Sequence, residues 1–172
     1  LVNTLQLSRA NIVEGGRHHN LKDFAGIPIS AAGFAYPPWP PVKTRFAING
    51  SLFNSILAED HIIHTPYESY NTVLRFFNEA AIDPTTEEIY VTLYRVASDS
   101  KIAHALITAA ANGKKVTVFV ELKARFDEAN NIRWGKKMKA AGVKIIYSIP
   151  DLKVHAKVAL VKAKKDGRQL YY

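Results

Sequence analysis

Two residues of this 172-residue sequence stand out chemically, the histidine and the lysine of His155-Ala156-Lys157. We predict a strand over His155–Val161, on which residues two apart share a face, so the imidazole and the ammonium would lie side by side. An imidazole nitrogen can attack phosphorus, and a fixed cation beside it can stabilise the charge on phosphoryl oxygens. Alone the pattern is a weak signal, because an amphipathic strand with a half-buried histidine produces it equally well.

Two arginines strengthen this interpretation. We place Arg95 at the C-terminal end of a strand over Ile89–Arg95, and Arg125 just past the end of a strand over Val116–Leu122. Ligands of open parallel sheets bind beyond the carboxyl ends of the strands, and an antiparallel strand would bring His155 to that same edge. The planar guanidinium fork suits phosphate. The alternative for each arginine is a surface ion pair, with Asp99 for Arg95 and with Glu121 or Asp127 for Arg125.

Short connections between helix-like and strand-like segments indicate an α/β fold. The order β-α-β-α-β implies a parallel sheet with right-handed crossovers, and Asp166-Gly167 between two strand-like runs predicts a hairpin. The apolar run Val116–Leu122 is typical of a strand covered on both sides. Around these segments we predict a helix between Tyr67–Asn71 and Asp83, a helix from Asp99 or Ser100 to Asn112-Gly113, a helix over Asp127–Ala141 closed by Gly142, and strands over Val143–Ser148 and Gln169–Tyr172.

The N-terminal segment, residues 1–41, differs from the rest. Four of the five residues Pro37–Pro41 are proline, which enforces an extended backbone and is typical of a linker. We therefore interpret residues 1–41 as the tail of a preceding domain with its linker, and residues 42–172 as one catalytic domain. Because the chain stops inside a predicted strand, we expect that domain to be incomplete at its C-terminus.

Composition excludes several classes of protein. The sequence has no cysteine, which removes disulfide scaffolds and thiolate chemistry, and it has neither of the common glycine-rich phosphate-binding motifs. It also has no apolar run of roughly 18 to 20 residues. Residues 1–100 carry 7 basic and 10 acidic side chains, a net charge of −3, whereas residues 101–172 carry 16 and 5, a net charge of +11. This asymmetry favours an anionic partner over a merely solvated surface.

Several segments, taken together, resemble the polyphosphate kinase family. The resemblance covers residues 42–172, and residues 1–41 more loosely. Its most specific part is the block Glu121-Leu122-Lys123-Ala124-Arg125-Phe126-Asp127-Glu128. The other matching segments, in chain order, are His64–Ser69, Ile89–Val96, Gly113–Val118, Asn131–Trp134, Ala141–Val143 and Leu152–Lys157.

The resemblance implies an α/β fold of the phospholipase-D-like type, a mixed sheet with a β-α-β-α-β core plus an antiparallel hairpin, flanked by helices. It implies reversible transfer of the terminal phosphate of ATP to inorganic polyphosphate, with Mg²⁺ as cofactor and ADP as product. The histidine that the family phosphorylates corresponds to His155, with Lys157 as a further phosphate contact. The arginines of the family's magnesium/phosphate site correspond to Arg95 and Arg125, which we interpret as phosphate clamps near the metal because magnesium itself favours carboxylates.

The expected partners are ATP, inorganic polyphosphate and the remaining domains of the same enzyme, with no specific nucleic acid. We expect a homo-oligomer when the enzyme is intact, and a cytoplasmic location with peripheral membrane association as an alternative. A second catalytic domain and the glycine-rich segment expected after Tyr172 are missing, so we expect this fragment to be inactive alone.

Two other functions stay open at this point. The phospholipase D signature has an aspartate where this sequence has Lys162, a departure that agrees with a kinase. A phospholipase-D-like phosphodiesterase or nuclease using the same His155 is one alternative. A basic, non-catalytic nucleic-acid-binding module formed by the C-terminal half is the other, although its aromatic residues do not alternate with basic ones as in a stacking platform.

Overall fold

The computed structural model describes residues 2–16, 26, 28, 33, 36–46, 50–122, 124, 126–149 and 152–172. The chain divides into two units, Leu1–Trp39 and Pro40–Tyr172, and the division falls inside the proline-rich run. The described residues of the first unit are exposed and include one 3₁₀ turn, η1 (Arg9–Asn11). The prediction that residues 1–41 are the tail of a preceding domain with its linker falls partly on residues outside the described ranges.

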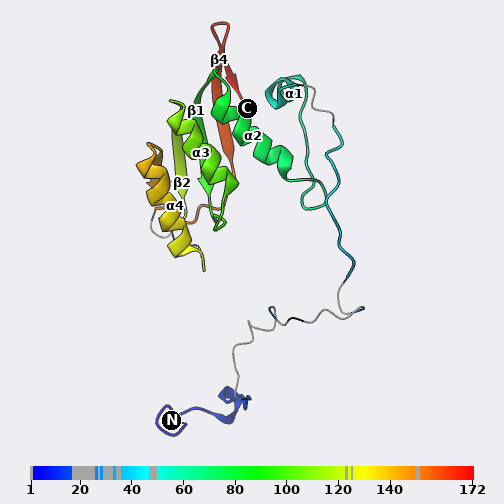
Figure 1. The fold of residues 1–172 in the computed structure, drawn as a ribbon. Coiled ribbons are helices and arrows are strands. Elements are labelled where there is room, and N and C mark those ends of the chain that lie inside the picture. Colours follow the sequence, from blue (N-terminus) through cyan, green and yellow to red (C-terminus); the bar gives the residue numbers. More distant parts are fainter. Residues whose placement is uncertain are drawn as a thin grey trace. The chain divides into compact units, whose positions relative to one another are not determined.

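The second unit is built on a mixed sheet (Figure 1). Its described strands are β1 (Thr86–Leu93), β2 (Lys115–Val120), β3 (Lys144–Tyr147), β4 (Ala159–Lys165) and β5 (Arg168–Tyr171). Their spatial order is β3-β2-β1-β4-β5. The first three strands are parallel, β4 pairs antiparallel with β1, and β5 pairs antiparallel with β4. The predicted β-α-β-α-β core with an added antiparallel hairpin is therefore confirmed.

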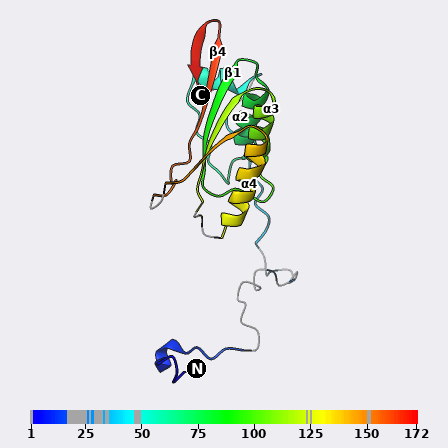
Figure 2. The same ribbon diagram turned by 90° about the vertical axis from the view of Figure 1, so that its left-hand side faces the viewer.

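The helices of the described chain are α1 (Leu52–Ala58), α2 (Asn71–Ile82), α3 (Lys101–Ala111) and α4 (Glu128–Ala140). Helices α3 and α4 are the crossovers between parallel strands, and Figure 2 shows α2, α3 and α4 on the same side of the sheet. None of the helices in the described ranges is long and apolar enough to cross a membrane. The core between helices and sheet includes Phe77, Ile89, Leu106, Val118, Trp134 and Met138.

The local signals for helix ends and turns agree with the structure. Ser100 caps α3, because its hydroxyl accepts a hydrogen bond from the backbone N–H of Ala103 at 3.1 Å. Gly113, which follows α3, has a φ of +81°, as a helix-terminating glycine requires. Asp166 and Gly167 both have positive φ and connect β4 to β5, so the predicted hairpin is confirmed.

Three sequence predictions need correction, and one helix was not predicted. Strand β2 is not covered on both sides, because Val116, Val118 and Val120 are buried while the residues between them are only partly buried. Strand β1 ends at Leu93, so Arg95 lies two residues beyond the strand. Strand β4 begins at Ala159, so the predicted strand over His155–Val161 is wrong in its first four residues. Helix α1 was not predicted, since its seven residues are too few for a clear apolar period.

A buried amide connects the loops at the carboxyl edge of the sheet. Asn131 of α4 is fully buried, and its Nδ2 donates to the carbonyl oxygens of Tyr94 at 2.8 Å and Glu121 at 2.9 Å. Its Oδ1 accepts from the N–H of Val96 at 3.1 Å. Asn131 therefore joins the segments that follow β1 and β2 to the crossover helix.

Replacing Asn131 with alanine would leave these three backbone groups without their partner, and unsatisfied buried groups are costly. We expect the Asn131→Ala variant of the intact protein to lose roughly 2–4 kcal/mol of unfolding free energy. Chemical denaturation measures this loss. The control is Ile132→Ala, one residue away but 41% exposed, which we expect to change stability little. Equal stability of the two variants would contradict the role given to the amide.

Candidate active site

The antiparallel pairing of β1 and β4 brings the segment that carries His155 to the carboxyl edge of β1. Val91 pairs with Ala159, and one residue further the backbone N–H of Thr92 donates to the carbonyl of Val158 at 2.9 Å. The chain before β4 therefore lies against the end of β1, where Arg95 follows two residues after the strand. His155 thus reaches the predicted edge, although from a segment that is not itself a strand.

Tyr94 is the shared neighbour of His155 and Lys157. The rings of Tyr94 and His155 meet edge to face, with centroids 5.8 Å apart and an interplanar angle of 87°. The ammonium of Lys157 lies 4.6 Å from the centroid of the same ring, a cation–π distance, and donates to the backbone carbonyl of His155 at 2.5 Å. Both side chains therefore contact the ring of Tyr94, although they do so from a segment that is not the strand on which they were predicted to share a face.

The imidazole of His155 is accessible. The residue is exposed. The described residues make no hydrogen bond to either of its ring nitrogens. A ring nitrogen with an accessible lone pair can act as a nucleophile. The packing on Tyr94 restrains the ring without occupying a nitrogen.

Arg95 forms an ion pair, though not with the residue proposed for it. Its Nε lies 2.9 Å from Oδ2 of Asp127, the residue before α4, rather than near Asp99. The Arg95 side chain is 55% exposed, and Asp127 holds it through Nε. The other predicted arginine, Arg125, lies outside the described residues.

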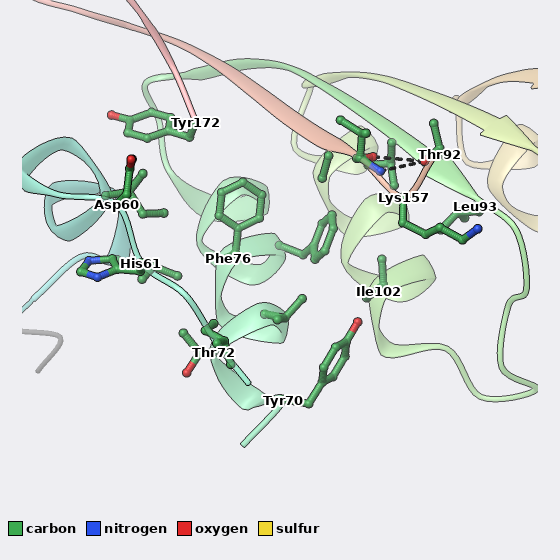
Figure 3. Close-up of a pocket in the computed structure, with 18 of the residues that line it drawn as sticks. Asp60, His61, Tyr70, Thr72, Phe76, Thr92, Leu93, Ile102, Lys157 and Tyr172 are labelled. Atoms are coloured by element: carbon green, nitrogen blue, oxygen red, sulfur yellow. Dashed lines mark hydrogen bonds between the residues drawn. The ribbon is translucent and has the colours of Figure 1, made fainter. Parts of the chain in front are cut away.

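Two cavities meet at Thr92. One, of about 890 Å³, is lined at one end by Thr92, Tyr94, Arg95 and Lys157 and is apolar over most of its length. Figure 3 shows Thr92, Leu93 and Lys157 at that end, with Asp60, His61 and Tyr172 at the other. The second cavity, of about 300 Å³, is lined by His155 and again by Thr92. The imidazole of His155 and the cations of Arg95 and Lys157 therefore line the two cavities at the end of β1.

Backbone contacts to the histidine segment come from Thr92 and from Glu121, which follows β2 directly. Sequence analysis made no functional prediction for Thr92, and it named Glu121 as an ion-pair partner and as part of the block most specific to the family resemblance. A possible signal was the position of both residues at the ends of adjacent parallel strands. That position alone did not distinguish them from ordinary polar strand ends.

Lys162, which replaces the aspartate of the phospholipase D signature, belongs to the sheet. Its ammonium lies 3.0 Å from Oε1 of Glu88 on β1, and this hydrogen bond raises the pKa of Lys162. Glu88 also accepts from the hydroxyl of Tyr90, and the hydrogen bonds from Tyr90 and then Lys162 lower the pKa of Glu88. Lys162 thus forms a cross-strand ion pair rather than part of the site.

The predicted assignment of Arg95 as a metal residue does not fit direct coordination. A guanidinium has donors and no acceptor, so Arg95 can hold phosphate oxygens but cannot ligate a cation. Over the ranges that the structure describes, no group of three or more histidine or carboxylate side chains could hold a metal ion. The groups at this edge suit an anion.

Comparisons with known proteins identify a family for this chain. Residues 51–172 match the family model for polyphosphate kinase C-terminal domain 1. The chain is 43% identical to a polyphosphate kinase of Escherichia coli K12 and 44% identical to one of Salmonella typhimurium LT2, in each case over 98% of this chain and 25% of the relative. A crystal structure of polyphosphate kinase from Porphyromonas gingivalis superposes with a TM-score of 0.76 at 40% identity, covering 95% of this chain and 25% of that chain.

The chain belongs to the polyphosphate kinase family. Its α/β fold is accordingly the phospholipase-D-like fold that the resemblance implied. The chain spans about a quarter of the length of the curated relatives it matches.

The contact with Tyr94 can be tested through the chemical reactivity of His155. In the intact protein, Tyr94→Phe keeps the ring and should leave the rate of His155 carbethoxylation by diethyl pyrocarbonate unchanged. Tyr94→Ala removes the ring from the imidazole and should raise that rate severalfold, because the histidine becomes more accessible. Peptide mass spectrometry measures both rates. An unchanged rate in Tyr94→Ala would contradict the edge-to-face contact.

Proposed function

We propose that the intact protein reversibly transfers the terminal phosphate of ATP to inorganic polyphosphate through a phosphohistidine at His155. The observation that carries the proposal is the position of His155. In a chain of the polyphosphate kinase family, this exposed imidazole lies at the carboxyl edge of β1 beside Lys157, and Arg95 follows the same strand. These are the groups that phosphoryl transfer needs, a nucleophile and cations around the oxygens of the transferred group.

In the first step, a ring nitrogen of neutral His155 attacks the γ-phosphorus of ATP. A nitrogen–phosphorus bond forms as the bond from the γ-phosphorus to the β,γ-bridging oxygen breaks, and ADP leaves with that electron pair. Arg95 donates hydrogen bonds to the equatorial oxygens of the transferred group, and Lys157 adds positive charge beside them. Tyr94 holds the attacking ring and the lysine against one surface.

In the second step, a terminal oxygen of polyphosphate attacks the phosphorus of phosphohistidine. The nitrogen–phosphorus bond breaks, the polymer is one phosphate longer, and neutral His155 is restored. Because both steps use the same groups, the reverse sequence makes ATP from ADP and polyphosphate. Positioning and electrostatics supply most of the acceleration, as in other phosphoryl transfers.

The substrate is Mg·ATP in this proposal, with Arg95 and Arg125 as phosphate contacts rather than metal ligands. Activity resides in the intact protein, to which this chain contributes His155, Lys157 and Arg95, and the chain alone is inactive. We further propose that the intact enzyme is a homo-oligomer in the cytoplasm. The net charge of +11 on residues 101–172 supports a polyanionic substrate, because it attracts one over long range.

His155→Ala tests the nucleophile directly. We expect the intact variant to lose both ATP-dependent polyphosphate synthesis and ³²P labelling by γ-labelled ATP, because the substitution removes the attacking nitrogen. The control is His104→Gln on α3, which alters a histidine that pairs with Asp99 outside the site and should keep wild-type rates. Retention of polyphosphate synthesis by His155→Ala would rule out the proposed intermediate.

Arg95→Lys tests whether the guanidinium fork matters beyond its charge. A hydrogen bond to a charged group contributes about 1.5–3 kcal/mol, so we expect a loss of roughly ten- to a hundredfold in kcat/KM for ATP. Arg133→Lys, on the outer part of α4, serves as the matched control and should have little effect. Wild-type kinetics in both Arg95→Lys and Arg95→Ala would show that Arg95 does not contact phosphate.

A further inference from the structure

We propose that Thr92 and Glu121 are positioning residues that hold the backbone on either side of His155 and thereby fix its imidazole for attack. The proposal rests on the role of His155 proposed above. Val154 and Ala156 are the two residues next to His155, and the proposal concerns their peptide groups. Each of these groups is hydrogen-bonded by a side chain from a different parallel strand end.

Glu121 holds the N-terminal side of His155. Glu121 is 1% exposed, and its Oε2 accepts a hydrogen bond from the backbone N–H of Val154 at 2.9 Å. Its Oε1 accepts from the hydroxyl of Ser148 at 3.0 Å, just past β3. The backbone N–H of Glu121 donates to the carbonyl of Leu93 at 2.9 Å, so the carboxylate is itself anchored to the end of β1.

Burial makes Glu121 a costly choice for stability alone. A carboxylate removed from water is stabilised only if its oxygens are well hydrogen-bonded, and an apolar residue of similar volume often serves stability as well. Charge-assisted hydrogen bonds are about twice as strong as neutral ones and have narrow geometry. The buried carboxylate therefore fixes the position of the Val154 peptide more closely than an apolar contact would.

Thr92 holds the C-terminal side. Its hydroxyl donates to the carbonyl of Ala156 at 2.6 Å and accepts from the N–H of Val158 at 2.9 Å. These bonds hold the chain just before the first residue of β4, and Figure 3 shows dashed hydrogen bonds at Thr92. Valine has the same shape as threonine and suits a strand equally well, so what the hydroxyl adds here is these two hydrogen bonds.

The two anchors determine where the imidazole lies. Among the described residues, the His155 ring packs on Tyr94 and makes no hydrogen bond. The orientation of the ring therefore depends on the position of its own backbone. A displacement of about 1 Å in an in-line reaction can cost on the order of a hundredfold in rate. Loosening either anchor should therefore slow phosphorylation of His155 without weakening nucleotide binding.

The experiment compares Thr92→Val with Thr92→Ser, and Glu121→Ala with Glu121→Gln, in the intact enzyme. Serine keeps the hydroxyl, and glutamine keeps an oxygen that can accept from Val154. The first measurement is the single-turnover rate of phosphohistidine formation with γ-labelled ATP, together with the KM for ATP. The second is hydrogen exchange of the peptide that spans residues 152–158, followed by mass spectrometry, which does not depend on activity.

We expect Thr92→Val and Glu121→Ala to slow phosphorylation by about tenfold or more, with KM within about twofold of wild type, and to speed exchange in residues 152–158. Serine and glutamine should restore most of the rate and of the protection. If Glu121→Ala fails to fold, the isosteric Thr92→Val carries the test.

Three results would overturn the proposal: wild-type phosphorylation in Thr92→Val, slower phosphorylation with unchanged exchange, or a loss in Glu121→Gln as large as in Glu121→Ala. The last would assign Glu121 a role through its charge. Phosphorylation that persists in His155→Ala would instead reject the proposed nucleophile, and the exchange measurement would still decide whether the two side chains hold the segment.

Discussion

The antiparallel pairing of β4 with the central strand β1 is the constraint on which the site depends. Strand β1 is parallel to β2 on one side and antiparallel to β4 on the other. As a result, the chain enters β4 at the same edge at which it leaves β1. Thr92 and Ala156, which are 64 residues apart in sequence, are joined there by a hydrogen bond. A parallel β4 would place His155 at the opposite edge from Arg95.

Buried polar side chains convert this topology into a defined geometry. Asn131 ties the segments after β1 and β2 together through backbone carbonyls, and Glu121 extends the connection to the residue before His155. Because an unsatisfied buried amide or carboxylate is costly, such groups favour one arrangement of the loops over its alternatives. Arg95, His155 and Lys157, by contrast, are exposed. The rigid part of the site therefore lies beneath the part that would meet substrate.

Much of the fold follows from local signals in the sequence. The end of α3 at Gly113 and the Asp166-Gly167 turn each have a local physical cause and were predicted. The cap of α3 was predicted as Asp99 or Ser100, and the structure has Ser100. The position of His155 at the carboxyl edge followed from the assumption of an antiparallel strand. The predicted start of that strand was wrong. The peptide groups of residues 154 and 156 hydrogen-bond to side chains rather than to the backbone of a neighbouring strand. The alternation of polar and apolar residues along the sequence cannot reveal this.

The same reason explains which site residues sequence reasoning missed. Glu121 and Thr92 act through backbone atoms of a distant segment, so no spacing along the chain marks them. The ion-pair partner suggested for Arg95, Asp99, was also wrong, because the structure pairs Arg95 with Asp127. Asp127 lies in the crossover after β2, whereas Asp99 lies in the loop nearer to Arg95 in sequence. Family resemblance pointed to His155, whereas only the three-dimensional structure shows which side chains hydrogen-bond to the backbone next to it.

The most direct test of the account is to map the phosphorylated residue in the intact enzyme. The wild-type protein is incubated with ATP, kept at alkaline pH to preserve phosphohistidine, and digested with trypsin. Mass spectrometry by electron-transfer fragmentation then locates the phosphoryl group. The account predicts it on the peptide Val154–Lys157, at His155, and predicts its loss on addition of ADP or polyphosphate. A phosphoryl group on another residue, with Val154–Lys157 unmodified, would contradict it.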